Sequence, residues 1–154
     1  MANNYVLAFD LGTSSIKVAI VDQDANIIAS GKRPILPKYP KKGWAESDPE
    51  VWWAEGCIAS KELIAQAGID PADIVGVGFD APSAGFIPVT KEKGALYPSL
   101  IWLDARGEEV LDECNQVLAE ALGVPGLEMW TGKDPVPKMC WAEGAALALE
   151  RSCR

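Results

Sequence analysis

The chain has 154 residues, a formal net charge of −8 at pH 7, and 49% hydrophobic residues. The length fits one globular domain, and the acidic balance argues against a nucleic-acid partner, since phosphate backbones bind basic surfaces. No apolar run approaches the roughly 18 residues of a membrane span, and Asn3-Asn4 is unlike the basic start of a signal peptide. We therefore expect a cytoplasmic protein that does not associate with membranes.

The chain contains no histidine, which excludes histidine-based triads and histidine-ligated metal sites within it. Its cysteines lack the C-x-x-C spacing of structural zinc sites: Cys57, Cys114, Cys140 and Cys153. We expect reduced thiols, and any general base must be a carboxylate or a rarer group.

The first part of the chain predicts three strands joined by short turns. Residues 5–10, 16–22 and 27–30 are apolar and rich in β-branched side chains. Short connections between neighbouring strands predict an antiparallel meander. The segment 34–43 contains three prolines and predicts an irregular loop.

A helix is predicted over residues 49–67, with Asp48 as its N-cap and Gly68 at its end. The residues expected on its buried face are Trp53, Cys57, Ser60, Ile64 and Ala67. Residues 74–79 predict a strand, and the crossover helix before it implies parallel pairing with a core strand.

The C-terminal half predicts a small hairpin and two helices. Residues 86–89 and 99–102 form the expected hairpin strands, and the last helix begins near Pro137. The helix over residues 110–122 has an apolar stripe: Val110, Leu111, Cys114, Val117, Leu118, Ala121 and Leu122. Gly123 should end this helix. The order of elements predicts an α/β fold with a mixed sheet.

A polar turn separates the first two predicted strands. It offers a carboxylate, a glycine, three hydroxyls and a lysine: Asp10, Gly12, Thr13, Ser14, Ser15 and Lys17. Glycine permits a positive φ and a close backbone approach to a ligand, and the amides and hydroxyls suit phosphate oxygens. The carboxylate at the strand end suits hydrated Mg²⁺. An ordinary hairpin with a polar turn is the alternative.

Two other glycine patterns do not support a nucleotide site. Residues 76–81 match G-x-G-x-x-A, but Pro82 follows and no helical period opens there. Residues 126–133 have five residues between the glycines, and Asp134 stands where a Walker A loop needs Ser or Thr.

Residues 9–17, Phe-Asp-Leu-Gly-Thr-Ser-Ser-Ile-Lys, resemble the first phosphate loop of the FGGY carbohydrate kinases, which include xylulokinase, glycerol kinase, gluconokinase and ribulokinase. Residues 43–53 resemble the family's G-W-x-E-x-D-P-x-x-W-W segment, and residues 100–106 its L/I-W-x-D-x-R motif. Residues 130–141 resemble its T-G and P-K-x-x-W pattern. The resemblance implies the ribonuclease H-like (actin-like ATPase) fold, a mixed sheet with flanking helices.

The resemblance also implies a reaction: ATP-dependent phosphorylation of a small sugar or polyol, with ATP and Mg²⁺ as cofactors. Asp10 would organise Mg²⁺, while Gly12, Thr13, Ser14, Ser15 and Lys17 would meet the phosphates. The residues expected to face the sugar are Asp80, Ala81, Pro82, Ser83, Trp102, Asp104 and Arg106.

Each sugar-side residue has an alternative role. Trp102 offers a flat face to a sugar or packs in a core, and Asp104 and Arg106 bind hydroxyls or pair with each other. Xylulokinases carry Gln-Met-His-Gly, and glycerol kinases an Arg-Glu pair, where this chain has residues 80–83, Asp-Ala-Pro-Ser. This segment is closer to the ribulokinase-like G-x-D-x-T/A, so Asp80 and Ser83 are expected to bind hydroxyls.

FGGY kinases have two actin-like domains with the active site between them, and their catalytic Asp lies late in the first domain. Residues 1–154 therefore resemble the N-terminal part of that first domain, and we expect the isolated chain to be inactive. We also expect exposed apolar surface and self-association. The alternative is a non-catalytic sugar-binding or truncated pseudo-kinase module. An actin-like scaffold shares the phosphate loop, but the Gly-Trp-x-Glu and Trp-x-Asp-x-Arg segments argue against it.

Overall fold

The structure is a computed structural model that describes residues 4–152, with side chains described for residues 4–145. The chain forms two compact units. The first unit comprises Met1–Pro37 and Asp48–Pro82, and the second comprises Lys38–Ser47 and Ser83–Arg154. The chain passes from one unit to the other after residues 37, 47 and 82.

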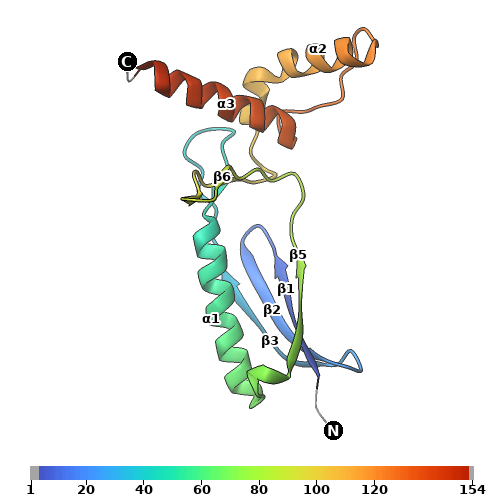
Figure 1. Cartoon of the computed structure of the whole chain (residues 1–154), viewed down its shortest axis with the longest axis vertical. Helices are drawn as coiled ribbons and strands as arrows, with labels where there is room; N and C mark the ends of the chain where they lie inside the picture. The colour runs from blue at the N-terminus through green and yellow to red at the C-terminus, as the bar shows by residue number, and fades with distance from the viewer. Residues whose placement is uncertain (1–3, 153–154) are drawn as a thin grey trace. The chain divides into compact units, whose positions relative to one another are not determined.

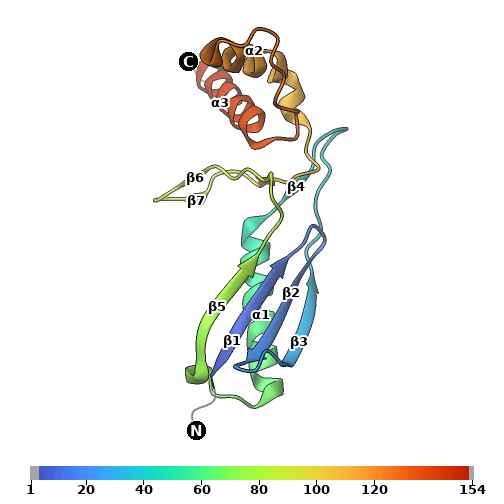
Figure 2. The ribbon, with the colours of Figure 1, turned by 90° about the vertical axis from the view of Figure 1, so that its right-hand side faces the viewer.

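The first unit contains a four-stranded sheet in the order β3-β2-β1-β5 (Figure 2). Its strands are β1 (Tyr5–Leu11), β2 (Ser15–Asp22), β3 (Ile27–Pro34) and β5 (Ile74–Asp80). The first three strands pair antiparallel, and β5 pairs parallel with β1. The predicted meander and the predicted parallel strand are therefore both confirmed.

Helix α1 (Pro49–Ala67) runs along one face of this sheet (Figure 1). The Asp48 carboxylate accepts the N–H of Glu50 at 3.0 Å, and Gly68 ends the helix in the left-handed region with φ 64°. Both predicted caps are confirmed. A short 3₁₀ helix, η1 (Pro71–Asp73), leads from α1 into β5.

The predicted buried face of α1 was right only in part, because Ile64 and Ala67 pack partly buried against the core but no predicted residue is fully buried. The buried residues are Gly56, Ala59 and Leu63, whereas Trp53 is 70% exposed. Small residues bring the helix close to the sheet, and a Cβ at Gly56 would lie 3.3 Å from Ile16 Cδ1. The close approach of α1 to the sheet determines which face of the helix is buried, and the spacing of apolar residues alone does not predict it.

The core of the first unit lies between α1 and the sheet. Its buried members are Leu7, Ile16, Val18, Ile20, Ala29, Ile35, Ala59 and Leu63. In β2 the side chains of Ile16, Val18 and Ile20 point into this core, so Lys17 between them points to the opposite face. The two-residue period of a strand thus separates packing residues from polar ones.

Apolar side chains remain exposed along β5 and α1. Val77 is 57% exposed and Phe79 is 71% exposed. With Trp52, Trp53 and Leu7 they line an apolar groove of about 670 Å³ in the first unit. Exposed apolar surface was expected, and self-association through it stays a prediction.

The second unit combines short strands with helices (Figure 1). Its elements are β4 (Glu46–Ser47), β6 (Val89–Thr90), β7 (Gly94–Ala95), β8 (Ser99–Leu100), η2 (Arg106–Val110), α2 (Leu111–Leu122) and α3 (Pro135–Ser152). Phe86 bridges Leu100, as the predicted hairpin of residues 86–89 and 99–102 requires, but the pairing of β6 with β7 was not predicted. The pairing of β4 with β8 was not predicted. No helix in the described residues is both long and apolar enough to cross a membrane.

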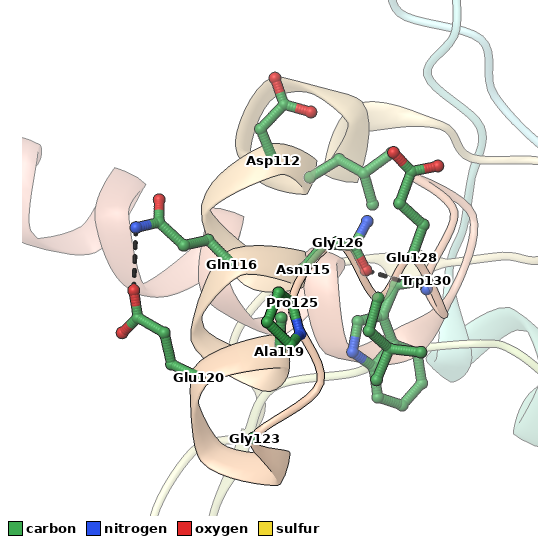
Figure 3. A pocket seen from close by; sticks show the side chains of 12 residues that line it. Asp112, Asn115, Gln116, Ala119, Glu120, Gly123, Pro125, Gly126, Glu128 and Trp130 are labelled. Carbon is green, nitrogen blue, oxygen red and sulfur yellow. Dashed lines mark hydrogen bonds between the residues drawn. The ribbon is translucent and has the colours of Figure 1, made fainter.

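Helix α2 buries a narrower face than its sequence predicts. Cys114 and Ala119 are buried, but Val117 is 61% exposed and Leu122 is 57% exposed. The polar residue Asn115 is buried as well, and its Oδ1 accepts the N–H of residue 129 at 3.2 Å and that of Trp130 at 3.1 Å, the second of which is drawn in Figure 3. Gly123 ends α2 in the left-handed region, as predicted.

A close backbone approach at Gly107 makes this position sensitive to any side chain. A Cβ there would lie 2.7 Å from both the Gly132 carbonyl oxygen and Pro137 Cβ. We expect Gly107→Ala to lower the free energy of unfolding by about 1–3 kcal/mol through overpacking. Gly144 in α3 is the control, since a Cβ there meets nothing within 4 Å.

Gly144→Ala should raise the free energy of unfolding by about 0.5–1 kcal/mol, because alanine loses less entropy in a helix. Urea unfolding of both variants measures the two effects. Equal effects would contradict the close approach at Gly107.

Burial and a neighbouring thiol, Cys140, raise the pKa of Cys114 to about 11. At pH 8 such a group is about one-thousandth thiolate, against about a quarter for an unperturbed thiol. We expect iodoacetamide to alkylate Cys114 about a hundredfold more slowly than a denatured control, with a rate that rises about tenfold per pH unit. Peptide mass spectrometry after timed labelling gives the rate of alkylation of Cys114. An equal rate in the folded and the denatured protein would contradict the raised pKa of this thiol. Cys153 lies outside the described residues.

Candidate functional site

The turn predicted to bind phosphate joins β1 to β2. The N–H of Gly12 donates to the carbonyl oxygen of Ser15 at 2.9 Å, and the carbonyl of Ser14 accepts the N–H of Ile35 at 3.0 Å. The first bond closes the turn, and the second ties it to the segment after β3. Ser15 is buried at the start of β2, while Ser14 is exposed.

The reason given for Gly12 needs correction. Its φ does not lie in the left-handed region. A Cβ at this position would instead lie 3.1 Å from the Ser15 carbonyl oxygen, inside the turn. The glycine is explained by the tight closure of the turn, since a side chain would press on the carbonyl oxygen of Ser15.

Four charged residues lie in one row across the sheet. In the strand registers Asp80 is the partner of Asp10, Asp10 of Lys17, and Lys17 of Lys32. Register partners on neighbouring strands point to the same face of a sheet. The structure therefore places Asp80, predicted for the sugar, beside Asp10, predicted for Mg²⁺.

Asp10 and Lys17 form an ion pair, with Lys17 Nζ 2.7 Å from Asp10 Oδ2. Their side chains are 46% and 60% exposed. The hydrogen bond to Asp10 and its charge raise the pKa of Lys17. Because both groups are exposed, the pair contributes little to stability and its members can turn to other partners.

The charged row lies on the sheet face opposite α1. Phe9 stacks on Phe79 at 4.7 Å and lines the groove beside α1, so the alternating residue Asp10 points the other way. Asp10, Lys17 and Lys32 line a separate cavity of about 490 Å³. This cavity presents one carboxylate and two ammonium groups, which is a suitable set for a metal-bound polyphosphate.

Asp10 could bind Mg²⁺ only together with other ligands, such as water and phosphate oxygens. Within the described residues, no group of three or more Asp, Glu, Cys or His side chains is placed to hold a metal ion. Mg²⁺ is usually bound by one or two carboxylates together with water and substrate phosphates. Asp10, with Asp80 as its neighbour, matches this mode of binding.

The residues predicted for the sugar are divided between the two units. Asp80, Ala81 and Pro82 belong to the first unit, where all three are exposed at the end of β5. Ser83 and Trp102 belong to the second unit; Ser83 is exposed and Trp102 is 43% exposed.

Asp104 and Arg106, also in the second unit, are buried in an ion-pair network. Arg106 Nη2 lies 2.8 Å from Asp104 Oδ2 and 2.7 Å from Glu46 Oε1. Asp104 Oδ2 also accepts the N–H of Ala45 at 2.6 Å. This geometry matches the alternative in which the two residues pair with each other.

Aromatic rings enclose the same guanidinium. Arg106 Cζ lies 3.7 Å from the ring centre of Trp44 and 4.8 Å from that of Trp141. The two indoles meet edge to face at 5.2 Å. Burial lowers the pKa of Arg106, but hydrogen bonds to Asp104 and Glu46 outweigh it and raise the pKa overall. Tryptophans from two of the sequence motifs, residues 43–53 and 130–141, thus pack against one buried guanidinium.

A pocket of about 610 Å³ lies between α2 and the segment that follows it (Figure 3). Asp112, Glu120 and Glu128 contribute carboxylates to its lining, and no basic side chain does so. The lining includes Gly126 and none of the predicted site residues. An acidic lining disfavours phosphate, which agrees with the rejection of a Walker loop at residues 126–133.

Sequence reasoning missed Lys138 as a structural centre of the second unit. Its side chain is fully buried, and Nζ donates to the carbonyls of Ala84 and Ile101, each at 2.9 Å. The available signal was a lysine among the apolar residues 135–142, Pro-Val-Pro-Lys-Met-Cys-Trp-Ala. Lysine is rarely fully buried unless its charge has partners.

Residues 5–144 match the N-terminal domain of the FGGY family of carbohydrate kinases. The chain belongs to this family. FGGY membership confirms the resemblance found in the four sequence motifs.

Glycerol kinase from Pseudomonas entomophila is 31% identical over 96% of this chain and 31% of its own length. Glycerol kinase 5 from Bos taurus is 35% identical over 72% of this chain and 21% of its own length. A xylulose kinase structure from Brucella ovis aligns with a TM-score of 0.77 and 25% identity, over 90% of this chain and 29% of the other. These FGGY relatives confirm the actin-like ATPase fold, and this chain spans about a third of their length or less.

Proposed function

We propose that the complete gene product transfers the γ-phosphoryl group of MgATP to a hydroxyl of a small sugar or polyol. In this proposal the 154-residue chain contributes the first phosphate loop and part of the sugar site. The observation that supports it most directly is the row Asp80, Asp10, Lys17 beside the closed β1–β2 turn, in a chain of the FGGY family. Phosphoryl transfer depends mainly on positioning and on neutralising charge, which such a row supplies.

The residues in and beside the turn would have different roles in binding MgATP. Bound Mg²⁺ would neutralise phosphate charge, and Asp10 would hold it through its carboxylate. Gly12, Thr13, Ser14 and Ser15 would form the loop that meets the β- and γ-phosphates. Gly12 and the buried Ser15 close the turn through their own backbone bond, so Thr13 and the exposed Ser14 would offer the amides and hydroxyls. Lys17, now paired with Asp10 at 2.7 Å, would turn its ammonium toward a phosphate oxygen. The base that takes the proton of the attacking hydroxyl would lie outside this chain.

Each unit contains exposed residues that we propose for the sugar. Asp80 and Ser83 offer a carboxylate and a hydroxyl, and both are exposed. Ala81 and Pro82 add contact area without side-chain hydrogen bonds. Trp102, 43% exposed, would pack against the C–H face of the sugar.

Asp104 and Arg106 would act by shaping the segment that carries Trp102, since their polar atoms bond within the second unit. A ketopentose or a short polyol is the substrate class that we propose. The named relatives include glycerol and xylulose kinases, which supports both alternatives.

The test is release of ADP by the complete gene product in a coupled assay with MgATP and a panel of glycerol, xylulose, ribulose and gluconate. We expect one member of the panel to raise the rate at least about tenfold above the sugar-free rate, since binding energy from the right substrate drives the step. Sugar binding by calorimetry without ADP release would contradict the kinase proposal and favour a non-catalytic sugar-binding module. Formation of a polymer in MgATP would favour an actin-like scaffold.

A further inference from the structure

Lys138, near the start of α3, has a fully buried side chain, and its ammonium group donates to two backbone carbonyls. One belongs to Ala84 and the other to Ile101, and both distances are 2.9 Å. The two acceptors are far apart in the sequence, but all three residues belong to the second unit. A single cation therefore joins two loops to α3.

The first of these loops is held in an unfavourable conformation. Ala84 has φ 60°, in the left-handed region that residues with a Cβ seldom adopt. Such conformations persist only where surrounding contacts enforce them, and they concentrate at functional sites. The bond from Lys138 to the Ala84 carbonyl is a contact of this kind.

Each acceptor lies next to a residue of the proposed sugar site. Ser83 directly precedes Ala84, and Trp102 directly follows Ile101. The Ile101 N–H also donates to the carbonyl of Ala45, so this segment is fixed from two sides. Lys138 thereby holds the backbone on which a hydroxyl and an indole face are presented.

Burying an ammonium group costs more free energy than burying an apolar side chain, because the charge loses its hydration. This cost argues for a specific role of Lys138. Burial lowers the pKa of Lys138, and the charge of Asp104 opposes this effect. An apolar side chain of similar length would avoid the loss of hydration, but it would leave the buried carbonyl of Ile101 and the partly buried carbonyl of Ala84 without this donor. The geometry needs a group that donates to both carbonyls at once.

We propose that Lys138 is a positioning residue for the sugar site: its ammonium sets the distance between the backbone at Ala84 and the backbone at Ile101, and so the places of Ser83 and Trp102. This inference rests on the proposed function for its role in substrate binding. It does not involve the phosphate loop, which belongs to the first unit. Loss of Lys138 should therefore weaken binding of the sugar and leave binding of the nucleotide unchanged.

The test compares wild type, Lys138→Met, Lys138→Arg and the control Lys133→Met in the complete gene product. Lys133 is an exposed lysine five residues earlier, so its loss removes the same charge without a buried contact. For Lys138→Met we expect the KM for sugar to rise at least about tenfold, while kcat and the KM for ATP stay within about twofold of the control. Lys138→Arg keeps the cation and its donors, and its KM for sugar should fall between wild type and Lys138→Met.

A second readout reports the position of Trp102 without any assay of activity. Protein labelled with 5-fluorotryptophan gives one ¹⁹F resonance per tryptophan, and Trp102→Phe assigns the resonance of interest. Lys138→Met should shift this resonance, and Lys133→Met should leave it in place. If Lys138→Met does not fold, Lys138→Arg carries both measurements: a rise in the KM for sugar but not for ATP, with a shifted Trp102 resonance, supports the proposal, and an unchanged KM for sugar overturns it.

An unchanged KM for sugar in Lys138→Met would overturn the proposal. An equal rise in the KM values for sugar and ATP would also overturn it, because that result indicates a general structural role. If wild type shows no sugar-dependent ADP release, the proposed function fails by itself. The ¹⁹F measurement then decides on Lys138 alone: a shifted Trp102 resonance supports the positioning role, and an unshifted one overturns it.

Discussion

Asp10→Asn is expected to lower the turnover of the complete gene product at least about a hundredfold, because the amide cannot replace a carboxylate that neutralises and orients a metal–phosphate complex. The Mg²⁺ concentration that gives half of the maximal rate should rise as well. Steady-state kinetics at several Mg²⁺ concentrations measures both effects. Stability should change by less than about 1 kcal/mol, since an exposed ion pair contributes little. Lys17 Nζ and Asp10 Oδ2 form such an exposed pair, 2.7 Å apart.

Asp24→Asn is the matched control for this change. Asp24 is exposed in the turn between β2 and β3, and the substitution removes the same charge from the same sheet. Its turnover should stay within about twofold of wild type, as is usual for surface substitutions away from a site. Equal turnover in Asp10→Asn and Asp24→Asn would rule out the metal role of Asp10.

Arg106→Met should lower the free energy of unfolding by about 3–5 kcal/mol, because it leaves buried carboxylates without their cation. The Arg106 and Asp104 side chains are both 0% exposed, and the Glu46 side chain is 8% exposed. The stacked ring of Trp44 also loses its partner, 3.7 Å away. Urea unfolding followed by circular dichroism gives the change.

Arg33→Met provides the contrast. Arg33 pairs with Glu55 at the same short distance, 2.7 Å, but its side chain is 33% exposed. We expect a loss of about 0–1 kcal/mol there, as for other solvent-screened pairs. A loss below about 1 kcal/mol in Arg106→Met would contradict the account of the second unit, which treats this buried network as its centre.

The strands of the first unit could be predicted because local signals agree with the fold. The alternation in β2 and the caps at Asp48 and Gly68 are local patterns, and the structure confirms them. The buried face of α1 could not be predicted in the same way. It depends on how close Gly56 lets the helix come to Ile16, which is a property of the packed pair.

The candidate site divides along similar lines. The turn that we propose for phosphate could be recognised from its residues, since the loop lies within one hairpin. The proximity of Asp80 to Asp10 depends on parallel pairing between strands far apart in the sequence, so only the structure reveals it. Asp104 lies two residues before Arg106, and the sequence already indicated that these two residues could pair. Glu46 and the acceptors of Lys138 lie on distant segments, and no local pattern predicts those contacts.

The central claim, transfer of a phosphoryl group to a sugar hydroxyl, is tested most directly by ³¹P NMR of the complete gene product with MgATP and each sugar of the panel. The account predicts a new phosphomonoester resonance with one of the sugars, in step with the conversion of ATP to ADP, and no such resonance in Asp10→Asn. Unchanged ATP with every sugar would contradict it. ADP formed together with inorganic phosphate, at a rate that no sugar alters, would contradict it equally.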